Sequence, residues 1–175
     1  MNSLLLVPLV VLSTVAATSQ TRKPPPHPLG PAEFYWLMNR ACWEGDEISV
    51  EMLLKAGADP TGIRDYEAFH KSPYQRGYEP SWPINQAAYG GHAGVIRLLL
   101  KAGAKPHAPE DEGQTALTIA AERGHIEVVR LLLEAGVDKN YQGPGLRGFV
   151  GTAEELARRS GHANVADAIR SFRGK

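Results

Sequence analysis

The chain has 175 residues, and its 19 lysines and arginines balance its 19 aspartates and glutamates, so the formal net charge is zero. A neutral balance gives no electrostatic footprint for nucleic acid, and we expect no nucleic-acid partner. The single cysteine, Cys42, excludes an intramolecular disulfide and a cysteine metal site. A hydrophobic content of 43% is ordinary for one globular domain.

Residues 1–19 predict a secretory signal peptide. The run 4–17 is mostly apolar, and small residues follow it up to Ser19, as at a cleavage site. The run is shorter than the roughly 20 residues that a membrane span needs. We therefore expect an exported protein, periplasmic or secreted. The alternative is a membrane anchor formed by residues 4–17, because Arg22 and Lys23 lie on the side of the run that disfavours export.

Residues 20–31 contain five prolines. Such a segment is extended and does not pack as a helix. It is interpreted as a spacer in front of a folded domain over residues 32–173.

Within that domain, apolar helices and glycine terminators recur with a period near 33 residues. Gly-His pairs begin at Gly91 and Gly124, which are 33 residues apart, and a third pair begins at Gly161. The segments VIRLLLKAGA and VVRLLLEAGV follow the first two pairs. A period of this size indicates a stack of like helix pairs.

The unit that begins at Gly113 is the clearest. Residues 117–121 give one apolar helical face, and Gly124 ends that helix with a left-handed cap. Residues 126–133 form a second, mostly buried helix, which Gly136 ends. Each unit therefore contributes two short helices and a turn.

The order of short motifs within the units is specific. The second unit contains Trp82-Pro83-Ile84-Asn85, Ala87-Ala88, Gly91-His92, Leu98-Leu99-Leu100 and Gly103-Ala104, and the third contains Thr115-Ala116-Leu117-Thr118, Ala120-Ala121, Gly124-His125, Leu131-Leu132-Leu133 and Gly136-Val137-Asp138. This order resembles the ankyrin repeat family. The family's histidine in the opening Thr-Pro-Leu-His tetrapeptide is replaced in every unit, by Asn39, Asn85, Thr118 and Glu155.

The resemblance implies an all-α solenoid of paired antiparallel helices joined by β-turn or hairpin loops. Its four units would cover about residues 34–60, 80–106, 113–140 and 150–172, with degenerate outer units. The resemblance also implies a non-catalytic protein–protein interaction module, without metal or cofactor. We expect a monomer whose partner is another protein.

The spacing between the first two units exceeds the period, which predicts a long inserted loop over residues 61–80. Five of the chain's 13 aromatic residues lie in or next to this loop, with basic residues between them. Tyr, Trp and Arg dominate the energetics of protein interfaces. The alternative is that the loop packs over the first two units.

The predicted partner-binding residues combine this loop with the surface of turn tips and first helices that the resemblance implies. They are Tyr66, Phe69, Tyr74, Arg76, Tyr78, Trp82, Tyr89, Glu122, Arg123 and Arg159. The function expected is that of an exported adaptor, inhibitor or immunity-type binder. Two alternatives are a membrane-anchored scaffold and, less favoured, an enzyme or small-molecule binder with a pocket under loop 61–80.

Other motifs fit structural roles better than chemical ones. The histidines of the Gly-His pairs recur at helix-packing distances, too far apart to share one zinc ion. The Gly-x-Gly-x-x-Gly match at 143–148 does not follow a strand of a βαβ unit. Cys42 takes the place of a small buried alanine, so we expect a buried thiol.

Overall fold

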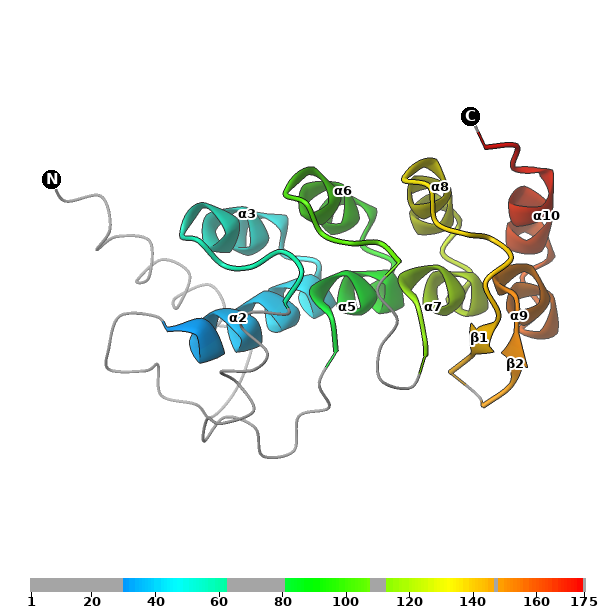
Figure 1. The fold of residues 1–175 in the computed structure, drawn as a ribbon, viewed down its shortest axis with the longest axis horizontal. Helices are drawn as coiled ribbons and strands as arrows, with labels where there is room; N and C mark the ends of the chain where they lie inside the picture. Colours follow the sequence, from blue (N-terminus) through cyan, green and yellow to red (C-terminus); the bar gives the residue numbers. More distant parts are fainter. Residues whose placement is uncertain (1–29, 63–80, 108–112, 147, 175) are drawn as a thin grey trace, which may run out of the picture.

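The structure is a computed structural model and describes residues 30–62, 81–107, 113–146 and 148–174. Its helices form two rows, and each row runs the length of the stack (Figure 1). The row of first helices is α2 (Pro31–Glu44), α5 (Pro83–Gly90), α7 (Ala116–Arg123) and α9 (Ala153–Arg159). The row of second helices is α3 (Glu47–Lys55), α6 (Ala93–Lys101), α8 (Ile126–Glu134) and α10 (Ala163–Ser171).

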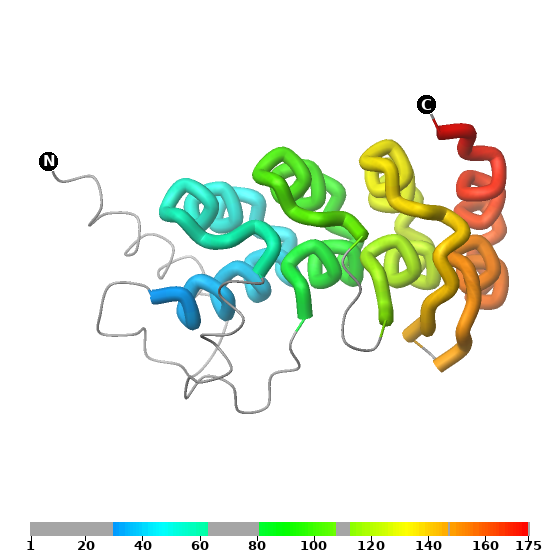
Figure 2. Tube along the Cα trace, viewed as in Figure 1, coloured from blue at the N-terminus to red at the C-terminus, as the bar shows by residue number. Residues whose placement is uncertain are grey.

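Each helix contacts its partner in the same pair and the equivalent helix of the next pair. Figure 2 shows this succession as pairs of coils that advance in one direction along the chain. The predicted all-α solenoid is therefore confirmed. In the part of the chain that the structure describes, no helix combines the length and the apolar character needed to cross a membrane.

A short hairpin precedes the last helix pair. Strand β1 (Gly143–Pro144) runs antiparallel to β2 (Val150–Gly151), with Gly143 opposite Gly151. The hairpin projects from the edge of the stack beside α9 (Figure 1). The sequence match at 143–148 is therefore a loop between repeats, as expected.

The core lies between the two rows of helices. Its small side chains come mainly from the first helices, and many of its large side chains come from the second helices. The first helices bury alanines such as Ala88 and Ala121, which let neighbouring helices approach closely. The second helices fill the remaining space with larger side chains such as Leu99 and Leu132, both fully buried. Cys42 lies at the alanine position and is fully buried. Burial raises the pKa of its thiol, so Cys42 has little thiolate character and belongs to the core.

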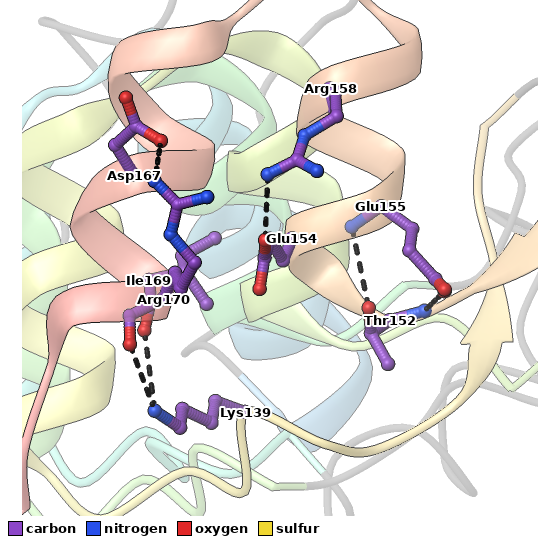
Figure 3. Close-up of polar contacts among 8 residues, drawn as sticks. All are labelled: Lys139, Thr152, Glu154, Glu155, Arg158, Asp167, Ile169 and Arg170. Atoms are coloured by element: carbon purple, nitrogen blue, oxygen red, sulfur yellow. Dashed lines mark hydrogen bonds and ion pairs between the residues drawn. The ribbon is translucent and has the colours of Figure 1, made fainter.

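The first helices begin in different ways because the tetrapeptide histidine is missing. Thr115 and Thr118 exchange hydrogen bonds between side chain and backbone N–H, as in a capping box. Thr152 and Glu155 do the same at the start of α9 (Figure 3). Asn85 is buried, and neither polar atom of its amide has a hydrogen-bond partner among the described residues. Asparagine therefore does not cap α5 as threonine caps α7.

Lys139 ties the last helix pair to the turn before it. Its ammonium donates to the backbone carbonyl of Phe172 at 2.9 Å. It also lies within 3.5 Å of the carbonyls of Ile169 and Arg170 (Figure 3). These carbonyls are at the C-terminal end of α10, where a cation is favoured by the helix dipole.

Candidate functional site

The Gly-His pairs hold successive units together. The imidazole Nε2 of His92 donates to the carbonyl of Trp43 at 2.9 Å, and that of His125 donates to the carbonyl of Tyr89 at 3.1 Å. Each acceptor belongs to the first helix of the preceding unit. These histidines therefore have a structural role, as their recurrence in the sequence predicted.

The glycines of the first two pairs make room for the histidine of the next unit. A Cβ atom added to Gly91 would lie 2.6 Å from Nδ1 of His125, and one added to Gly124 would lie 2.6 Å from Nδ1 of His162. Both glycines have a positive φ, 77° and 82°, which few other residues adopt. The first unit has Asp46 in place of histidine, and this carboxylate caps α3 by accepting from the backbone N–H of Ser49 at 3.0 Å.

Burial lowers the pKa of His125 below its usual value, and the nearby charge of Arg123 lowers it further. The hydrogen bond to the carbonyl of Tyr89 opposes this shift. A lowered pKa means that the folded state favours the neutral imidazole. The stability that the neutral imidazole contributes to the fold is complete above the unfolded-state pKa, about 6.5. This stability is lost as the pH falls through the folded-state pKa.

Acidification should therefore destabilise the wild type more steeply than His125→Gln. Thermal unfolding of both proteins, followed by circular dichroism from neutral pH to below about 6, measures the two slopes. The two proteins share every other titratable side chain, so the difference in slope belongs to His125. Parallel dependences of Tm on pH would contradict this assignment.

A row of flat side chains lies beside these turns, at the C-terminal ends of three first helices. The rings of Trp43 and Tyr89 stack with their centroids 4.8 Å apart and an angle of 23° between their planes. The guanidinium of Arg123 lies over the Tyr89 ring, 3.8 Å from its centroid. Because Trp43 and Arg123 come from the units on either side, they hold the Tyr89 ring between them. Trp43 is 50% exposed, although it is large and apolar.

The same register, two residues before the glycine of the Gly-His pair, is held by Glu122 and Arg159 in the last two units, and there the loop between β1 and β2 contacts it. Glu122 is only 6% exposed, and its carboxylate accepts a hydrogen bond from the backbone N–H of Leu146 at 2.5 Å. The guanidinium of Arg159 lies 4.7 Å from the centre of the Phe149 ring. The loop between β1 and β2 therefore occupies the surface of α7 and α9, while the Trp43–Tyr89–Arg123 row remains accessible.

The structure brings some of the predicted partner-binding residues together and separates others. Tyr89 and Arg123 are in contact, as part of the row. Trp82 immediately precedes α5 and packs, partly buried, against the core. The predicted surface position of Glu122 is wrong, because the loop that follows β1 folds back and buries its carboxylate. Arg159 is exposed and contacts Phe149.

The predicted loop residues Tyr66, Phe69, Tyr74, Arg76 and Tyr78 lie outside the described residues. Their part in binding stays a prediction.

Trp43 is the residue of the row that the sequence reasoning missed. The signal was present, since Trp43 stands two residues before Gly45 just as Tyr89 stands two residues before Gly91. The first unit lacks a Gly-His pair, so this correspondence was hidden.

No three His, Cys, Asp or Glu side chains among the described residues come together in a way that could hold a metal ion. A recess of about 730 Å³ lies beside Val137, Lys139 and Phe172. The ammonium of Lys139 in this recess already binds backbone carbonyls at the end of α10.

The comparisons with known proteins agree with this architecture. No curated protein matches the chain. The family model described as ankyrin repeats matches in three copies over residues 38–143, which is more than half of the chain. The last helix pair, α9 and α10, lies beyond the matched range. The chain belongs to the ankyrin repeat family.

Proposed function

We propose that the chain is a non-catalytic binding protein whose partner docks on the row Trp43–Tyr89–Arg123. Ankyrin repeats indicate a protein–protein interaction module. The observation that carries the proposal is the half-exposed indole of Trp43, stacked on Tyr89 in a row that crosses three units. A preorganised aromatic surface offers a large contact area at low cost in conformational entropy.

Trp43→Ala should weaken partner binding by about 2 kcal/mol or more, as truncation of an interface anchor does. Loss of the stack should cost the fold about 0.5–1.5 kcal/mol, in addition to the apolar area of the half-buried indole. The partner is captured from the native envelope fraction and identified by mass spectrometry. Its dissociation constant is then measured by calorimetry for wild type and variant.

Ile48→Ala is the matched control. Ile48 is a large apolar residue of the same unit and is 70% exposed, but it lies on the second helix α3 and outside the row. It should leave the dissociation constant unchanged. If Trp43→Ala binds like wild type, the row is not the interface. Alanine variants of Tyr66, Phe69, Tyr74 and Tyr78 belong in the same assay, and loss of binding there would locate the interface on the inserted loop.

The proposed location is outside the cytoplasm, with a role as adaptor, inhibitor or immunity-type binder towards an envelope protein. The support is the apolar run 4–17 followed by a proline-rich spacer. N-terminal sequencing of the purified native protein should give a start near Thr18 or Gln20. A start at Met1 in a membrane fraction would instead support the membrane-anchored scaffold.

A further inference from the structure

Arg123 brings an exposed guanidinium to the row. The face of its guanidinium is used by the Tyr89 ring at 3.8 Å. A guanidinium has five N–H donors in its plane, and stacking leaves these edges available. Within the residues that the structure describes, no carboxylate forms an ion pair with Arg123, whose side chain is exposed. The row therefore offers donors as well as an aromatic surface.

The carboxylates next to the row are already engaged. Glu44 follows Trp43 directly and binds Arg40 through an ion pair of 2.6 Å. Glu122 precedes Arg123 and turns into the loop after β1, where it accepts from the backbone N–H of Leu146. Neither of these two carboxylates pairs with Arg123, so its cation stays available to a partner.

The chain's own loop shows how a peptide segment lies on this register. Over α7 and α9, Leu146 packs against the core and donates its backbone N–H to Glu122, and Phe149 lies beneath the guanidinium of Arg159. The segment thus combines an apolar contact, a polar contact and an aromatic–arginine contact. In the accessible row, the hydrogen-bond donor is Arg123 of the solenoid. A segment bound there must therefore supply the hydrogen-bond acceptor.

We propose that the partner binds through an acidic segment, in which an Asp or Glu side chain pairs with Arg123 and an adjacent apolar side chain covers the ring of Trp43. This inference rests on the proposed function and specifies its partner. Carboxylates pair with a guanidinium through two parallel hydrogen bonds, which makes the contact selective for an acid over an amide. The acidic side chain of the partner complements the charge of Arg123, and the apolar side chain of the partner packs on Trp43.

Selection of displayed random peptides on the immobilised full chain tests this inference. The peptides are fused at their C-terminus, so they carry no free terminal carboxylate. Wild type should enrich sequences with Asp or Glu next to a large apolar residue. For a synthetic, terminally capped peptide from this pool, Arg123→Gln should lower the affinity on the order of tenfold, and added salt should weaken wild-type binding. Arg123→Lys keeps the positive charge but loses the paired N–H donors of the guanidinium, so it should lower the affinity less than Arg123→Gln does.

Arg130→Gln is the control, because Arg130 is an exposed arginine on the second helix α8. It should retain wild-type affinity. Selected peptides that need Trp43 but lack acids, and that bind Arg123→Gln and wild type equally, would overturn the acidic partner while the proposed function stands. If no selected peptide is lost on Trp43→Ala, the proposed interface fails, and the acidic partner fails with it. Circular dichroism verifies that each variant is folded.

Discussion

Leu132→Ala should lower the free energy of unfolding by about 2–5 kcal/mol, the range for deleting a buried leucine side chain. Leu132 is fully buried in α8, which contacts α7 in its own pair and α6 and α10 on either side. A stack of repeats is stabilised by interfaces between neighbours, so a cavity in a central unit weakens the contacts on both sides. Urea denaturation measures the midpoint and the slope of the transition.

Leu131→Ala and Arg130→Ala are the matched controls, since the three residues are consecutive in one helix. Leu131 is half-buried and Arg130 is exposed, whereas Leu132 is fully buried. The loss of stability should therefore increase from Arg130 to Leu131 to Leu132. Equal midpoints for Leu131→Ala and Leu132→Ala would contradict the observed orientation of α8.

The fold could be predicted from the sequence because its determinants are local and repeated. The alanine pair, the Gly-His pair and the leucine run recur in register in the two central units, and each motif has one structural task. Alanines bring the first helices together, and the leucine runs fill the space between the rows. A fold assembled from nearest-neighbour contacts leaves its period in the sequence, so self-similarity indicated a stack of helix pairs, and the resemblance to ankyrin repeats then implied the solenoid.

The candidate site was less predictable because it depends on contacts between units. Glu122 occupies the same register position as Tyr89, so the pattern placed both on the surface. Glu122 is buried because a loop 24 positions later in the chain folds back over it. The backbone N–H of Leu146 in that loop donates to the Glu122 carboxylate. The periodic pattern contains no information on where an irregular loop turns back. Trp43 was missed for a related reason, since the first unit has Asp46 where the histidine marks the register.

Gly124→Ala should destabilise the fold more than Gly136→Ala, although the two glycines have nearly the same backbone conformation. Their φ angles are 82° and 86°, so the left-handed strain on alanine, about 1–2 kcal/mol, is common to both. No atom of the described residues lies within 4 Å of a Cβ added to Gly136, whereas one added to Gly124 would lie 2.6 Å from Nδ1 of His162. We expect an additional loss of about 1–3 kcal/mol at Gly124, the cost of overpacking.

A double-mutant cycle separates the steric contact from the backbone strain. In the His162→Ala background the imidazole is gone, so Gly124→Ala should cost only what Gly136→Ala costs. The coupling between Gly124→Ala and His162→Ala should then equal the additional 1–3 kcal/mol or so of overpacking. Urea denaturation of the single and double variants measures it. Additive losses would mean that glycine is needed at this position for its φ alone. A coupling of the expected size would explain the Gly-His pair as a contact between units, in which glycine accommodates the histidine that follows one period later.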